Sequence, residues 1–421
     1  SIVVILLTEM FEIKNKGMIV LCAAIFVSFP TVVSSFAYMY TADAYLLAFL
    51  LATLAVYLTW CVKKWGTIAG MVCLAFAMGI YQAYATVAIV LVLLYIIRQF
   101  VIEKLDFLEA VRKDLKYLGM LVGGAVLYAV ILKITLIRYN ITLPGYQGIG
   151  ALGIMSLGQY KAALQKTLYH FRLILGMEHG VEKHVYSLLN AAALLLIGLI
   201  LIYLLVRNQV YKKKMSMLAS IAAVCLIPVG AYFINFTSPD VQYYTLMEMA
   251  VCLIYLLMII MLLQLDWKTW ISKILKGCGI FVLCGLVYYN VINCNIAYFN
   301  MNLSYHKSIS IAEDVLQRIE QMDEFQNQHD KVVIMGDYNC ATENLQIMMP
   351  SIMGISNDSF LNDSYHYTII WNYCFGVQME QASYDEMIGI IDTDEYKNMP
   401  VYPLKGCVDY INGVIVVRMQ E

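Results

Sequence analysis

Apolar stretches separated by short polar connections dominate the first two thirds of the chain. A helix needs about 20 consecutive apolar residues to cross the hydrocarbon core of a bilayer. By this measure the pattern predicts nine or ten membrane-spanning helices, with two short spans between 66 and 97. The predicted spans are 1–9 in part, 18–38, 44–62, 66–80, 83–97, 116–137, 186–206, 216–235, 243–264 and 277–297.

Basic residues lie in alternate connections between these spans, whereas the turns 39–43, 80–83 and 236–242 contain no Lys or Arg. Cytoplasmic connections of membrane proteins carry an excess of Lys and Arg, so the basic connections are predicted to be cytoplasmic. The opposite face then carries the three turns, a long loop at 138–185 and the C-terminal tail. The basic connections contain Lys14, Lys16, Lys63, Lys64, Arg98, Lys104, Arg112, Lys113, Lys116, Arg207, Lys212, Lys213, Lys214, Lys268, Lys273 and Lys276.

The tail has a different pattern, typical of a small α/β domain. An amphipathic helix is predicted over 304–325, a buried strand over 331–336 and a helix over 342–349, where Pro350 ends it. The segment 408–419 carries Asn412-Gly413 in its middle, which is a strong signal for a two-residue hairpin turn. We therefore expect this part of the chain to have a core of its own.

Composition agrees with a membrane protein. Of 421 residues, 61% are hydrophobic and 14% are charged, whereas soluble domains are about 25% charged. A net charge of −2 and the lack of basic clusters interleaved with aromatic residues argue against nucleic-acid binding. We predict a mainly α, polytopic transmembrane helical bundle over 1–297 and an extracytoplasmic α/β domain over 298–421. The chain opens inside an apolar run, which we interpret as the end of a helix that begins before Ser1.

Asp43 is the first candidate for chemistry, because it lies in a very short connection between two uncharged spans. A charge near the bilayer is costly, and a helical hairpin does not require one. Tyr38, Tyr40 and Tyr45 surround it, and such rings can stack on polyhydroxylated ligands. The alternative interpretation is an interfacial aromatic belt with an incidental acid.

Two further groups lie on the same predicted face. Tyr81, Gln82 and Tyr84 form a second polar turn, in which Gln82 either hydrogen-bonds a sugar or caps a helix. Arg172 in the long loop could fork onto a phosphate of a lipid-linked substrate, because a guanidinium matches phosphate geometry.

Metal and disulfide signals are weak. His179 and Glu182 are three residues apart, but Lys183 is next to them and a solvated loop is the simpler interpretation. The eleven cysteines include no CxxC pair, which disfavours a zinc ribbon, and a disulfide among Cys340, Cys374 and Cys407 is left open. A divalent cation is the one cofactor that the sequence leaves open.

Three segments resemble a known family. They are Phe29-Pro30 through Tyr38-Met-Tyr-Thr-Ala-Asp43-Ala-Tyr45, Gly79-Ile-Tyr-Gln-Ala-Tyr84 and the closing Asn412-Gly-Val-Ile-Val-Val417. These segments are similar to the bacterial type II glucosyltransferases, which decorate O-antigen and related surface glycans. The resemblance implies a GT-C-type enzyme of the bacterial inner membrane, with a polyprenyl-phosphate-linked sugar, typically glucose, as donor. It also implies a cell-surface polysaccharide as acceptor and catalysis on the extracytoplasmic side.

The resemblance assigns Asp43 to the second extracytoplasmic loop, where an acid orients the acceptor or binds a cation. The principal base of such enzymes lies in the first extracytoplasmic loop, which we expect before Ser1. The expected substrate-binding residues are Tyr40, Tyr81, Gln82, Tyr84 and Arg172. The rival interpretations are a transporter or flippase, or a polymerase, of lipid-linked glycans.

Overall fold

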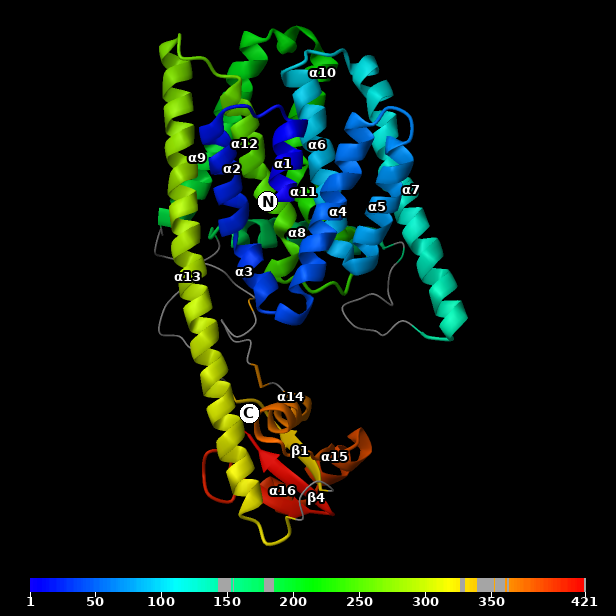
Figure 1. The fold of residues 1–421 in the computed structure, drawn as a ribbon, viewed down its shortest axis with the longest axis vertical. Helices are drawn as coiled ribbons and strands as arrows, with labels where there is room; N and C mark the ends of the chain where they lie inside the picture. Colours follow the sequence, from blue (N-terminus) through cyan, green and yellow to red (C-terminus); the bar gives the residue numbers. More distant parts are fainter. Residues whose placement is uncertain are drawn as a thin grey trace. The chain divides into compact units, whose positions relative to one another are not determined.

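The structure is a computed structural model that describes residues 1–142, 153, 155–177, 185–325, 330–338, 352, 360–361 and 363–419. The chain forms two compact units, Ser1–Cys294 and Asn295–Glu421 (Figure 1). The helix α13 (Trp270–Glu320) contributes residues to both units. Each unit is described separately below.

The first unit is built from helices that run side by side (Figure 1). Short 3-10 helices connect several of them at the turns. The helices are α1 (Ile2–Met10), α2 (Lys16–Ser28), α3 (Pro30–Phe36), η1 (Met39–Thr41), α4 (Ala42–Cys61), α5 (Gly66–Ile80), η2 (Gln82–Tyr84), α6 (Ala85–Val101), α7 (Phe107–Tyr139), α8 (Leu157–Ile174), α9 (Val185–Arg207), η4 (Val210–Lys212), α10 (Lys214–Cys225), α11 (Ile227–Ala231), η5 (Phe233–Phe236), η6 (Thr245–Met247), η7 (Met249–Cys252), α12 (Leu253–Leu263) and the first part of α13.

The prediction of a mainly helical membrane protein is confirmed. Among the described residues, five helices are long and apolar enough to cross a membrane, or six if α2 and α3, bent by 43°, form one span. The segment 66–97 contains two helices, α5 and α6, joined by η2, as predicted. Further apolar helices, such as α5, are shorter than a full span, so the total of nine or ten spans stays a prediction.

Burial divides the helices into central and peripheral ones. In the apolar window of α6, 72% of the residues are buried, compared with 11% in that of α7. Helix α5 packs between α4 and α7. A Cβ atom at Gly70 of α5 would lie 2.6 Å from the Ala55 carbonyl oxygen of α4, so this glycine permits the close approach of the two helices. Helix α7 therefore presents most of its surface to the lipid.

The second unit contains a four-stranded sheet in the order β2-β1-β4-β3. Strand β1 (Lys331–Met335) is parallel to β2 (Glu380–Gln381) and β4 (Val414–Arg418), whereas β3 (Val408–Ile411) is antiparallel to β4. The other helices are α14 (Ser364–Ile370), the π-helix η8 (Trp371–Phe375), α15 (Tyr384–Ile391) and α16 (Asp394–Asn398). The sheet is thus mixed, with the two longest strands parallel.

The last part of α13 packs on this sheet. Ala312, Leu316 and Ile319 are buried with sheet residues such as Ile415, and the Trp371 Nε1 donates to the Ala312 carbonyl at 2.7 Å. The predicted amphipathic helix is therefore present, but it continues the preceding span and ends at Glu320. Asn412 and Gly413 both have positive φ, as the predicted hairpin turn requires.

The predicted long loop at 138–185 contains the 18-residue helix α8, which is not among the helices long and apolar enough to cross a membrane. Ser156 and Gln159 form a capping box at its start, a signal that the sequence carries. The predicted helix over 342–349, Pro350 and Cys340 lie outside the described residues. Cys374 and Cys407 are free thiols.

Candidate functional site

Asp43 lies in the first turn of α4, directly after η1. It is exposed, and its Oδ1 accepts a hydrogen bond from the backbone N–H of Ala44 at 2.8 Å. The positive end of the helix dipole favours a carboxylate at this position. Tyr40 in η1 is 84% exposed. Both side chains are therefore accessible to a ligand.

The structure brings the two predicted turns together through their aromatic rings. The ring of Tyr45 on α4 lies 5.1 Å from that of Tyr81, and Tyr81 lies 6.0 Å from Tyr84 in η2. Tyr84 is buried, and its hydroxyl donates to the Leu246 carbonyl at 3.5 Å. Tyr81 is half-buried. Tyr84 thus anchors the turn, while Tyr81 is the ring that a ligand near Asp43 can reach.

Gln82 has a different environment from the neighbouring tyrosines. Its Nε2 donates to the hydroxyl of Tyr128 on α7. Gln82 and Tyr128 both line a mainly apolar cavity of about 400 Å³ formed by α5, α6, α7 and the region of η5. Met78, Ile89, Leu121 and Phe233 are among the apolar side chains of its wall. The cavity suits an apolar chain more than a sugar.

A buried polar cluster that the sequence did not predict is formed around Glu248. Glu248 is 4% exposed and accepts a hydrogen bond from the Tyr232 hydroxyl at 2.7 Å. The Tyr232 ring lies 4.9 Å from that of Tyr243. Among the described residues, the buried Tyr243 hydroxyl has no hydrogen-bond partner.

Helix α8 completes this cluster. The His170 ring lies 6.1 Å from Tyr232 and 5.5 Å from Tyr243. Burial, helped by the nearby Lys166, lowers the pKa of His170 to about 4, so the imidazole is neutral at pH 7. Lys166 donates to the Val241 carbonyl, and burial lowers its pKa as well. Thus α8 packs onto the segment that carries Glu248 and supplies no cationic imidazole at neutral pH.

Arg172 is exposed in the last turn of α8, two residues from His170. The structure therefore places it on the helix that reaches the cluster, with a side chain accessible to solvent. His179 and Glu182 lie outside the described residues. Within the ranges that are described, no group of three His, Cys, Asp or Glu side chains is arranged to hold a metal ion.

Among the residues of this cluster, only Glu248 carries a signal in the sequence. Glu248 interrupts a predicted span, and an acid inside an apolar segment indicates a polar partner. Tyr232 and Tyr243 carry no comparable signal, because tyrosines are frequent at membrane interfaces and the chain has 32 of them.

A model of the family described as glucosyl transferase GtrII matches residues 1–247. The matched segment includes Asp43, the Tyr81–Tyr84 turn, Arg172 and Tyr243, and it ends directly before Glu248. No curated protein and no solved structure matches the chain.

Proposed function

Because this match covers more than half of its length, the chain belongs to the glucosyl transferase GtrII family, and we propose that it transfers glucose from a polyprenyl-phosphate donor to a cell-surface polysaccharide. The transfer takes place at the end of the first unit that carries Asp43, which we assign to the extracytoplasmic side of the bacterial inner membrane. The family match supports glucosyl transfer, and the arrangement around Asp43 supports the location.

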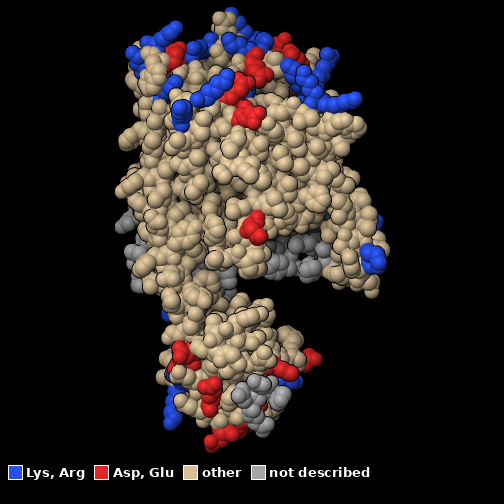
Figure 2. Space-filling model, viewed as in Figure 1, with Lys and Arg blue, Asp and Glu red and all other residues tan. Residues whose placement is uncertain are grey.

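The distribution of charge in the first unit supports this orientation. Lys and Arg side chains gather at one end of it, beyond a broad uncharged belt (Figure 2). Ion pairs join the connections at that end, namely Arg98–Glu12, Lys213–Asp106 and Arg207–Asp266. By the positive-inside rule this is the cytoplasmic end. The second unit, Asn295–Glu421, is then extracytoplasmic and available to contact the acceptor.

Transfer of a glycosyl group forms a bond between the sugar C1 and an acceptor hydroxyl, while the C1–O bond to phosphate breaks. The acceptor must lose a proton, and the departing phosphate needs positive charge. We assign the orientation of the acceptor hydroxyl, directly or through a divalent cation, to the exposed carboxylate of Asp43. Arg172 is the residue with suitable chemistry for the phosphate.

The remaining predicted residues take separate roles. Tyr40 and Tyr81 provide accessible rings on which a sugar can stack, whereas the buried Tyr84 stabilises the turn. The apolar cavity beside Gln82 and Tyr128 is suited to part of the polyprenyl chain. The observation that carries the assignment of the site is that the exposed Asp43 lies at the start of the same helix, α4, as Tyr45, whose ring lies 5.1 Å from that of Tyr81.

The test supplies polyprenyl-phosphate-[14C]glucose to membranes that contain the protein and follows the label into surface polysaccharide. Asp43→Asn should lower transfer by about 100-fold or more, within the range found for positioned acids and bases. Glu109→Gln is the matched control, because Glu109 is another exposed acid in the first turn of a helix. Equal activity in wild type and Asp43→Asn would refute the site, and wild-type membranes without transfer would refute the donor.

A further inference from the structure

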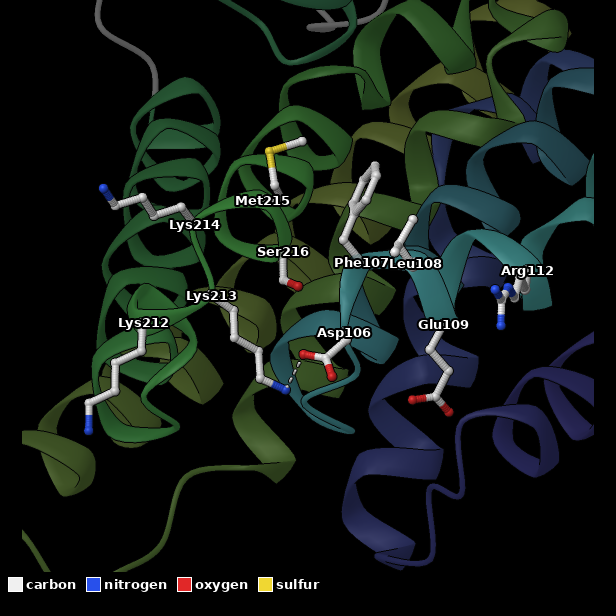
Figure 3. Close-up of a pocket in the computed structure, with 10 residues that line it drawn as sticks. All are labelled: Asp106, Phe107, Leu108, Glu109, Arg112, Lys212, Lys213, Lys214, Met215 and Ser216. Carbon is white, nitrogen blue, oxygen red and sulfur yellow. Dashed lines mark ion pairs between the residues drawn. The ribbon is translucent and has the colours of Figure 1, made fainter.

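A wide pocket lies at the basic end of the first unit, away from Asp43. Its volume is about 920 Å³. Two segments line it, the start of α7 with Asp106, Leu108, Glu109 and Arg112, and the segment from Lys212 to Ser216 at the start of α10 (Figure 3). We call it the α7–α10 pocket. The proposed glucosyl transfer uses none of its residues.

The pocket carries an excess of positive charge. Its wall has four cations, Arg112 and Lys212 to Lys214, and two acids. Both acids are already neutralised, since Asp106 pairs with Lys213 at 2.8 Å and Glu109 pairs with Lys113 at 2.9 Å. Within the described part of the chain, the side chains of Arg112 and Lys214 form no ion pair or hydrogen bond. The unneutralised charges therefore attract an anion.

The arrangement of these charges fits a lipid headgroup better than a small free anion. Lys213 reaches across to Asp106, whereas Lys214 points away on one side and Arg112 lies on the other (Figure 3). A free phosphate needs donors that converge on one point, but here the cations flank an open depression. Apolar side chains accompany them, because Leu108 is 71% exposed and Met215 is 57% exposed. Charge and apolar surface together suit the membrane interface.

The position of the pocket makes it accessible to lipid. Helix α7 is the peripheral helix whose apolar window is only 11% buried, and the pocket lies at its start. The backbone also contributes, because α7 and α10 both begin at the pocket and neither has a side-chain capping hydrogen bond. The free N–H groups of these first turns add to the positive potential.

We propose that the α7–α10 pocket binds an anionic glycerophospholipid from the leaflet at the basic end of the unit. Arg112 and Lys214 attract the anionic headgroup electrostatically from the two sides of the depression, while Leu108 and Met215 contact the upper part of the acyl chains. The Lys213–Asp106 pair holds the start of α7 to that of α10 and keeps the two free cations apart.

The experiment measures lipid binding to the purified full-length protein in detergent by native mass spectrometry, with phosphatidylglycerol, phosphatidylcholine or inorganic phosphate added. Phosphatidylglycerol should bind more tightly than phosphatidylcholine. The double variant Arg112→Gln/Lys214→Gln should weaken phosphatidylglycerol binding by about twentyfold, because each Lys or Arg near an anionic lipid contributes a factor of about five. The matched control is Lys63→Gln/Lys64→Gln, which removes two exposed cations outside the pocket. This control should change phosphatidylglycerol binding little.

The proposal would be overturned by equal binding of the two lipids, by equal loss in the pocket variant and in the control, or by inorganic phosphate that competes at the concentration of the lipid. If the double variant does not fold, Lys212→Gln/Lys214→Gln removes two cations from the Lys212–Ser216 wall of the pocket, one of them the proposed Lys214, and should again lower phosphatidylglycerol binding. Unchanged binding in a folded pocket variant would also refute it.

Discussion

The two ends of the first unit use polar residues in different ways. At the basic end, charged side chains join neighbouring connections, as when Arg98 pairs with both Glu12 and Glu103. At the other end, Asp43 is exposed and accepts a hydrogen bond from its neighbouring backbone N–H, and Glu248 is buried against a tyrosine hydroxyl. The comparison indicates that ion pairs hold the helices together at the basic end, whereas the exposed carboxylate of Asp43 is accessible to a ligand.

The largest effect on stability is expected from Arg98→Ala at the basic end. Arg98 is 13% exposed, donates to the Met10 carbonyl at 2.9 Å and lies 5.2 Å above the Trp60 ring, in addition to its two ion pairs. Its removal takes away the donor to the partly buried Met10 carbonyl and two ion pairs with acids that are 66% and 35% exposed, at a cost of about 1–2 kcal/mol. Thermal unfolding in detergent should show a lower Tm, while the transfer activity of the folded protein stays close to that of wild type.

Arg98→Lys is the control for this variant. Lysine keeps the charge but lacks the planar guanidinium, so its Tm should lie between those of wild type and Arg98→Ala. An unchanged Tm in Arg98→Ala would mean that these contacts do not hold the basic end together.

A smaller effect, and one on activity instead of stability, is expected from Tyr81→Ala at the Asp43 end. The half-buried ring contacts Tyr45 and Tyr84, and such aromatic pairs contribute about 0.5–1.5 kcal/mol. If Tyr81 stacks on a sugar, its loss should lower kcat/KM for transfer by about tenfold, mainly through KM. Tyr81→Phe keeps the ring and should retain most of the activity. A normal kcat/KM in a folded Tyr81→Ala would exclude Tyr81 from the site.

The smallest effect is a pH dependence that comes from His170 in the buried cluster. The folded pKa of His170 is about 4, below the value of about 6.5 in unfolded chains. The unfolded state therefore binds more protons between these values, and the stability that neutral His170 contributes is complete above pH 6.5 and is lost as the pH falls toward 4. His170→Phe keeps a ring against Tyr232 and Tyr243 but cannot be protonated.

This dependence is checked by measuring Tm between pH 4 and 7. The Tm of wild type should fall more steeply over this range than that of His170→Phe, by a few degrees at most. Parallel curves would show that His170 is not held neutral by its surroundings.

Parts of the candidate site differ in how well the sequence indicates them. Asp43 can be found from the sequence because a charge between two apolar spans is conspicuous. The contact of its helix with Tyr81 cannot be found in this way, since it depends on how α4 and η2 pack. The sequence predicts one shared role in substrate binding for Tyr81, Gln82 and Tyr84. In the structure the three side chains contact different partners, because neighbouring residues in a short turn point in different directions.

The sequence by itself determined the order of apolar helices, the asymmetry of charge between their connections and the hairpin at Asn412-Gly413. These features depend on hydrophobic periodicity, on loop composition and on local backbone preferences, all of which act over a few residues. Only the tertiary structure decided that His170, Tyr232 and Glu248 share one buried cluster, that Gln82 faces α7, and that the starts of α7 and α10 form one basic pocket. Those contacts join residues far apart in the chain, and they exist because packed helices bring particular faces together.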